Sequence, residues 1–188
     1  MSTHLRPLLA ACLFTLVAPS FAVPLVADGQ WNAFDVDEYS AASAGVEWID
    51  IFNGGQPLSF EFVVPAGYFG TLTVVDGGFA GDRFTVKDGA TTLGVTSAAV
   101  SNTDANIGLD FDAALADSAY SRASYTLAAG SHSVSGWLSQ SALFEGMPLN
   151  ATVGALRLEV SAVPEPSALV MLLAGAGLLA FVARRRAI

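Results

Sequence analysis

Cysteine and histidine are nearly absent from this chain of 188 residues, which contains one cysteine and two histidines. Cys12 and His4 both lie in an N-terminal segment that we expect to be removed, so the mature chain would keep only His132. A disulfide, a zinc–thiolate site, a cysteine nucleophile and a site built on two histidines are then excluded. No G-x-S-x-G sequence accompanies His132, which we interpret as an ordinary strand residue within Ser131–Val134.

Basic residues are also scarce, and they are unevenly placed. Residues 23–163 hold sixteen acidic residues and four basic ones, a balance of −12, against −9 for the whole chain. Such a surface repels DNA, RNA and anionic lipid, so we expect no nucleic-acid partner. It suits an exported protein that must stay soluble, or one that collects divalent cations.

The N-terminal residues 1–22 read as a signal peptide for Sec-dependent export. Arg6 supplies a positive charge, Leu8–Ala18 forms an apolar core, and small residues precede a cleavage site after Ala22. The alternative is a lipobox, Leu9-Ala10-Ala11-Cys12, that would make Cys12 a lipidated first residue. Only about five apolar residues precede that cysteine, too few for a signal core.

The C-terminal residues 163–188 have three parts in a fixed order. Pro164-Glu165-Pro166 comes first, then an uncharged apolar run from Ala168 to Ala183, then Arg184-Arg185-Arg186. The prolines disfavour helix for the residues before them and keep this segment extended. At about 1.5 Å per residue, a helix over 168–183 reaches roughly 25 Å, at the short end for a transmembrane span. The arginines would then stay on the cytoplasmic side as a membrane stop.

This three-part order resembles the PEP-CTERM sorting domain of exported proteins from Gram-negative bacteria. The resemblance implies that an exosortase, a membrane-embedded cysteine transpeptidase-like enzyme, recognises Pro164, Glu165 and Pro166 and cuts there. It also implies a precursor held in the inner membrane facing the periplasm, and a mature form at the cell surface or outside the cell. The alternative is an ordinary C-terminal membrane anchor after a proline-rich linker.

Residues 23–162 predict an all-β domain, a single jelly-roll-like β-sandwich of about eight short antiparallel strands. Apolar and polar residues alternate in the strongest candidates, and glycine-rich turn sequences separate them. The strong candidates are Leu58–Val64, Gly70–Val75, Arg83–Lys87 and Ala155–Val160, and the weaker ones are Gly45–Phe52, Thr92–Thr96, Ser124–Leu127 and Ser131–Leu138. One short helical turn is expected within Asp112–Tyr120.

Parts of this body are similar to a sandwich that recurs in PEP-CTERM proteins. The similar stretches are Gly78–Phe84, Asp110–Asp117 and Tyr120–His132. This resemblance implies the fold and export, and it implies no particular reaction. Such proteins often have Asp-Pro-Asp where this chain has Asp110-Phe111-Asp112.

Aspartates are the candidate metal ligands. Asp76 and Asp82 flank the glycine-rich loop 77–81, and a second group follows further along the chain: Asp110, Asp112 and Asp117. Calcium takes six to eight oxygen ligands from carboxylates and carbonyls, so a structural Ca²⁺ between the two loops is one hypothesis. The other is that these aspartates cap turns and keep the loops hydrated.

No catalytic constellation stands out, so we expect a non-enzymatic exported surface or matrix protein associated with exopolysaccharide. A carbohydrate-binding module is the alternative, for which Trp31 and Tyr39 near the mature N-terminus are candidate stacking rings. A secreted glycan hydrolase is a further alternative. It requires two facing carboxyls in a groove, at least one of them with a raised pKa.

Overall fold

The structure is a computed structural model that describes residues 21–164 and 168–186. The expected signal peptide therefore lies outside the described residues, except for Phe21 and Ala22. The described residues form fourteen strands: β1 (Phe21–Pro24), β2 (Asn32–Asp37), β3 (Ile49–Asp50), β4 (Gln56–Val64), β5 (Tyr68–Asp76), β6 (Phe79–Ala80), β7 (Arg83–Asp88), β8 (Thr91–Val95), β9 (Asn102–Asn106), β10 (Arg122–Leu127), β11 (Gly130–Gln140), β12 (Leu143–Phe144), β13 (Met147–Pro148) and β14 (Ala151–Ala162). Three helical segments accompany them: η1 (Ile51–Asn53), α1 (Phe111–Ala116) and α2 (Ala168–Arg186).

Ten strands join in one sheet that folds over itself. Its order is β10-β5-β14-β2-β3-β4-β11-β7-β8, and β1 also pairs with β4. The start of β4 pairs with β3, whereas its remainder pairs with β1 and β11, so β4 carries the sheet from one half to the other. Two smaller two-stranded sheets, β6–β9 and β12–β13, lie beside it.

The sheet is nearly closed, because residues at the ends of its two outer strands, β8 and β10, hydrogen-bond to each other. Thr96 follows β8, and its hydroxyl lies 2.8 Å from that of Ser121, which precedes β10. The Ser97 amide donates to the Arg122 carbonyl at 2.9 Å, and the Arg122 amide donates to the Ser97 hydroxyl at 3.1 Å. Thr96 and Ser121 are fully buried at this seam.

Alternating side chains build the core between the two halves of the sheet. Phe60, Phe62 and Val64 of β4 are buried, whereas Glu61 and Val63 between them are exposed, as expected for a half-buried strand.

Aromatic rings join the two halves. Phe34 of β2 stacks on Trp48 at 3.9 Å between ring centroids and meets Phe84 of β7 edge-on at 5.1 Å. These three side chains are at most 1% exposed, so aromatic packing contributes strongly at the centre of the fold.

The all-β prediction is confirmed and nearly all strand pairs are antiparallel as predicted, but the predicted number of strands is too small and one pair is parallel. More than eight strands form, and β1 pairs parallel with β4, with Phe21 opposite Leu58 and Pro24 opposite Glu61. Strand β2, with the sequence Asn-Ala-Phe-Asp-Val-Asp, was not predicted, although buried Phe34 and Val36 alternate in it with half-buried Asp35 and Asp37. The weak candidate Gly45–Phe52 yields only the two-residue β3 and the start of η1.

The C-terminal segment forms helix α2 where a helix was predicted. Among the described residues, however, no helix is long and apolar enough to cross a membrane. The prediction of a transmembrane helix at 168–183 is therefore not confirmed.

Candidate functional site

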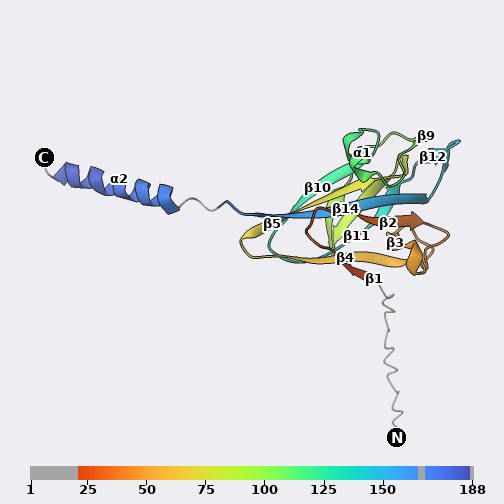
Figure 1. The fold of residues 1–188 in the computed structure, drawn as a ribbon, viewed down its shortest axis with the longest axis horizontal. Coiled ribbons are helices and arrows are strands. Elements are labelled where there is room, and N and C mark those ends of the chain that lie inside the picture. Colours follow the sequence, from red (N-terminus) through yellow and green to blue (C-terminus); the bar gives the residue numbers. More distant parts are fainter. Residues whose placement is uncertain (1–20, 165–167, 187–188) are drawn as a thin grey trace, which may run out of the picture.

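The candidate site is a pocket at the end of the sheet where β14 begins. Ala151, Thr152 and Val153 line it, and the same strand ends at Ala162 beside the sorting segment. Twelve residues at about 3.3 Å each make β14 roughly 40 Å long. The pocket and the sorting segment therefore lie at opposite ends of the β domain, as the course of β14 in Figure 1 shows.

The pocket has a volume of about 280 Å³ and a mixed polar and apolar wall. Its polar groups include three carboxyls, an amide and a hydroxyl. The lining residues with polar side chains are Asp35, Asp37, Asp82, Asn106 and Thr152. The apolar part of the wall includes Ile51, Phe79 and Leu149.

Hydrogen bonds tie the loops of this end into one rim. The Glu38 amide donates to the Asn150 carbonyl at 3.2 Å, and the Asn150 side-chain amide donates to Glu38 Oε2 at 2.7 Å. The Ala42 amide donates to the Gly55 carbonyl at 2.8 Å. Loops 38–45, 51–55 and 141–150 are thus held together, and we call them the rim loops.

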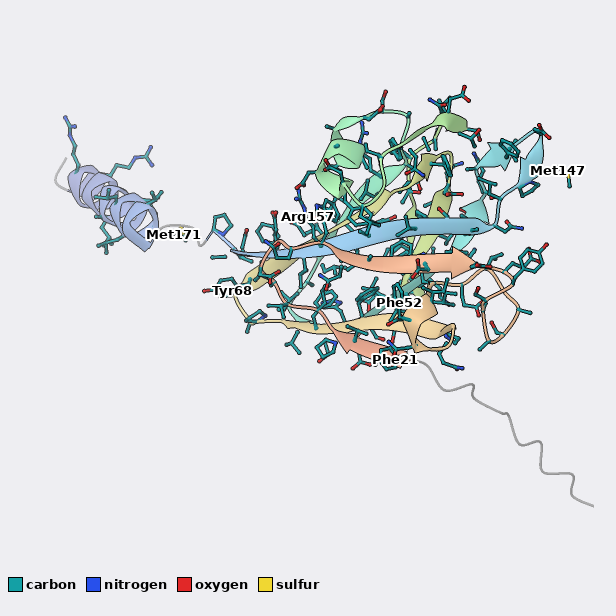
Figure 2. The ribbon with its side chains drawn as sticks, turned by 45° about the vertical axis from the view of Figure 1, so that its right-hand side comes forward. Phe21, Phe52, Tyr68, Met147, Arg157 and Met171 are labelled. Carbon is teal, nitrogen blue, oxygen red and sulfur yellow. The ribbon has the colours of Figure 1, made fainter. Side chains whose placement is uncertain are left out.

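The rim loops carry large side chains that are almost fully exposed. Tyr39 is 92% and Phe52 93% exposed, and each follows closely on a pocket residue, Asp37 and Ile51 respectively. The hairpin formed by β12 and β13 adds Leu143, Phe144 and Met147, which are also exposed. Figure 2 shows Met147 at this end and Tyr68 at the other.

Two neighbouring aspartates are buried at the pocket, and Asp82 is part of its lining. Asp76 ends β5 and Asp82 precedes β7, and they are 0% and 2% exposed. Asp76 Oδ2 accepts the amides of Gly81 and Asp82, both at 3.2 Å, whereas its Oδ1 has no hydrogen-bond partner among the described residues. Asp82 accepts the Ala142 amide at 2.7 Å and the Thr152 hydroxyl. The pair therefore joins loop 77–81 to the rim and to β14.

Burial changes the acidity of these groups. Desolvation, reinforced by the charge of Asp82, raises the pKa of Asp76 to about 8, against opposing amide hydrogen bonds. Desolvation raises the pKa of Asp82 to about 6, although Thr152 and Ala142 hydrogen-bond to its carboxylate. Desolvation also raises the pKa of Asp35, and nearby Asp50 and Asp37 add to this effect. At neutral pH the Asp76 carboxyl is thus protonated.

The remaining predicted metal ligands lie on and around α1 and have other partners. Asp110 caps α1 by accepting the Ala113 amide at 3.0 Å, and Asp117 ends the helix. Asp112 Oδ1 accepts Trp31 Nε1–H at 3.0 Å and Arg157 at 3.2 Å. The Arg157 guanidinium lies 4.5 Å from the centre of the Trp31 ring, so this tryptophan anchors α1 to the sheet instead of offering a free stacking surface.

The five aspartates do not come together as one calcium site. The structure brings Asp76 and Asp82 together and places the three aspartates around α1 in separate hydrogen bonds. In the part of the chain that the structure describes, no three acidic, histidine or cysteine residues form a group suited to hold a metal ion. Burial, capping and helix anchoring already engage most of these carboxyl oxygens, and calcium binding stays a prediction.

His132 is held between two oxygen acceptors. Its Nδ1 lies 2.7 Å from Asp88 Oδ2, and its Nε2 lies 2.9 Å from the Ala128 carbonyl oxygen. Its ring also stacks on Phe62. Both nitrogens are therefore engaged within the domain, and neither is directed at a serine nucleophile.

The sorting residues are described only in part. Pro164 directly follows the last residues of the β domain and is exposed, whereas Glu165 and Pro166 lie outside the described residues. Arg184 and Arg185 are exposed in the last turns of α2, which also includes Arg186.

Sequence reasoning missed the residues that make the pocket. Asp35, Asp37, Asn106 and Thr152 come from three distant segments, and no local motif connects them. One available signal was the alternation Phe34-Asp35-Val36-Asp37, which predicts a strand with two carboxyls on one face.

The comparison with protein families agrees with the C-terminal pattern. Residues 162–186 match the family model of the PEP-CTERM protein-sorting motif. The molecule is thus an all-β domain followed by a sorting signal. The chain carries a PEP-CTERM protein-sorting motif, which supports exosortase-dependent export through a membrane-anchored precursor.

Other comparisons add little. No curated protein matches the chain. Among solved structures, the pre-peptidase C-terminal domain of a collagenase from Bacillus anthracis aligns with 78% of this chain and 100% of its own, at 6% identity and a TM-score of 0.39.

Proposed function

We propose that this chain is a non-enzymatic surface or matrix protein, sorted by an exosortase, that binds a neutral exported polysaccharide through the rim loops. The observation that carries the proposal is that Tyr39 and Phe52, two exposed rings, follow closely in the chain on Asp37 and Ile51, which line a polar pocket remote from the sorting segment. While the precursor is tethered by its C-terminal segment, this end is free to meet material outside the membrane.

The chemistry of the pocket suits hydroxyl-rich ligands. Aromatic faces pack against the C–H faces of sugar rings, and carboxyl and amide oxygens accept hydrogen bonds from sugar hydroxyls. The Asp35 carboxyl and the side-chain amide of Asn106 line the pocket and offer such polar groups. The acidic surface disfavours anionic polymers, which is why the proposal is for a neutral polysaccharide.

Affinity electrophoresis tests the proposal. Residues 23–163 are run through gels that contain the neutral fraction of the host exopolysaccharide, with alginate as the anionic comparison. We expect retardation by the neutral polymer only. Tyr39→Ala with Phe52→Ala should weaken it by roughly tenfold, since a stacked ring contributes about 0.5–1.5 kcal/mol.

Tyr68→Ala is the matched control, because Tyr68 is an exposed ring at the other end of the domain. It should leave retardation unchanged. Absence of retardation by the neutral fraction, or equal retardation of the Tyr39/Phe52 variant, would overturn the proposal.

A glycan hydrolase is the second candidate, because Asp35 and Asp82 line one pocket and both have a raised pKa. Against it, both oxygens of Asp82 accept internal hydrogen bonds, and those of Asp37 accept the Tyr39 and Ser40 amides and the Ser40 hydroxyl. A reducing-sugar assay distinguishes the two candidates: release of sugar that Asp35→Asn abolishes would favour the hydrolase.

A further inference from the structure

The β domain ends directly at the sorting tripeptide, without a linker. Ala162, the last residue of β14, pairs with Tyr68, the first residue of β5. The next amide, that of Val163, donates to the Gly67 carbonyl at 2.8 Å. Pro164 follows at once, so the sheet continues up to the residue that precedes the sorting tripeptide.

The partner of this strand end is a tight turn. The Tyr68 amide donates to the Pro65 carbonyl at 3.1 Å, and Gly67 has a φ of +82°. A positive φ at the third position of a four-residue turn is the type II pattern, which favours glycine there. The turn between β4 and β5 thus presents the Gly67 carbonyl to Val163 from a fixed position.

An enzyme that cuts the sorting tripeptide must also come close to this turn. Only residues 164–167 separate Val163 from the start of α2, a reach of at most about 18 Å in a fully extended chain. An enzyme that cuts within this stretch must therefore approach the end of the sheet, where Val63, Tyr68 and Val163 are exposed. Figure 2 shows Tyr68 at the end of the domain from which the chain leads to α2.

A cutting enzyme binds its peptide as an extended strand whose backbone groups face the enzyme. While Ala162 and Val163 are bonded to Tyr68 and Gly67, one edge of that strand is occupied. We propose that the exosortase cuts after the end of β14 has detached from the turn between β4 and β5, so that this turn regulates access to the sorting motif.

Detaching the end of β14 from the turn costs little free energy. Ser161, Ala162 and Val163 are exposed, so they bury little apolar surface, and strand ends open locally far more often than the whole domain unfolds. Further inward, Leu158 and Leu156 of β14 are at most 1% exposed and hold the strand in the core. The opening therefore stops before the core is disturbed.

A disulfide across the last pair tests this step in the full-length chain. Directly opposite residues of antiparallel strands have Cα atoms about 4.5–5.5 Å apart, within the range of a disulfide. Tyr68→Cys with Ala162→Cys would lock the end of β14 in the oxidising periplasm. In a host that contains the exosortase, we expect the oxidised variant to be processed at least about tenfold more slowly than wild type, as seen by immunoblot of cut and uncut forms.

A second disulfide is the matched control. Thr71→Cys with Glu159→Cys joins the same two strands three pairs further inward, where no opening is required. This variant should be processed at the wild-type rate. Circular dichroism and melting of both purified variants check that they are folded.

An inserted linker tests whether slow processing is caused by restricted access to the sorting tripeptide. Four residues, Gly-Ser-Gly-Ser, inserted between Val163 and Pro164 of the Tyr68/Ala162 disulfide variant should restore processing. Unchanged processing of that disulfide variant, equal slowing by the inner disulfide, or failure of the linker to restore cutting would each overturn the proposal. These results do not depend on polysaccharide binding, which is measured at the opposite end of the domain.

Discussion

Asp76 shows how one side chain can make the stability of this domain depend on pH. Its carboxyl is fully buried beside that of Asp82, and its pKa is raised from 3.8 to about 8. The folded state therefore holds this proton more tightly than the unfolded state does. The contribution to stability is complete below about pH 4 and is lost as the pH rises through about 8.

The first prediction is that Asp76→Asn flattens this dependence. For wild-type residues 23–163, the free energy of unfolding should be lower at pH 8.5 than at pH 5 by more than about 1 kcal/mol, since one pKa unit corresponds to about 1.4 kcal/mol. The melting temperature should fall accordingly. The asparagine stays neutral and can still accept the Gly81 and Asp82 amides. Thermal melts at both pH values measure the difference, and an equally steep loss in the variant would contradict the assignment.

Calcium provides a control for the same pair. If Asp76 and Asp82 share a proton and hold no cation, calcium and EDTA should leave the melting temperature at pH 8.5 unchanged. A rise with calcium that Asp76→Asn removes would show that the pair binds a cation instead.

At the scale of elements, strand β14 connects the two sites of the molecule. It pairs with β2 from Ala151 to Leu156, near the pocket, and with β5 from Gly154 to Ala162, up to the sorting segment. Its Gly154 lies where a side chain has no room, because a Cβ atom there would come within 2.4 Å of the Phe34 ring. The absence of a side chain allows the aromatic core to pack against the strand.

The second prediction is that Gly154→Ala destabilises the domain by about 1–3 kcal/mol, the usual cost of overpacking a core. Gly45→Ala is the control, since a Cβ atom there meets chiefly the flexible end of the Glu47 side chain. Urea unfolding followed by tryptophan fluorescence measures both variants. Equal stability of Gly154→Ala and wild type would contradict this packing.

The elements that could be predicted from the sequence are those with strong alternation. Phe60, Phe62 and Val64 indicate β4, and the core confirms them. Strands β6, β12 and β13 have two residues each, too few for any periodicity. The parallel pairing of β1 could not be foreseen, since an expected cleavage site lies within that strand.

The candidate site was less predictable than the fold. Turn chemistry correctly suggested capping for Asp110, whose side chain accepts an α1 amide. Buried Asp82 accepts hydrogen bonds from Ala142 and Thr152, which lie sixty and seventy positions further along the chain. Contacts over such distances follow from topology, and a local pattern does not contain them.

At the scale of the whole molecule, the β domain is expected to fold without either terminal segment. The third prediction is that residues 23–163 form a monomer with a β-type circular dichroism spectrum and one cooperative melt. Loss of Phe21 and Ala22 removes half of β1, but both residues are exposed, so the effect on stability should be small. A non-cooperative melt would show that the terminal segments are part of the fold.

The seam at Thr96 and Ser121 affects how copies of the protein can associate at high local concentration. Proteins displayed in large numbers on a cell risk joining through unpaired strand borders into fibres. Here the outermost strands of the main sheet, β8 and β10, are followed and preceded by residues that bond to each other. The contact between these residues therefore leaves less room for a neighbouring copy to add a strand at this border.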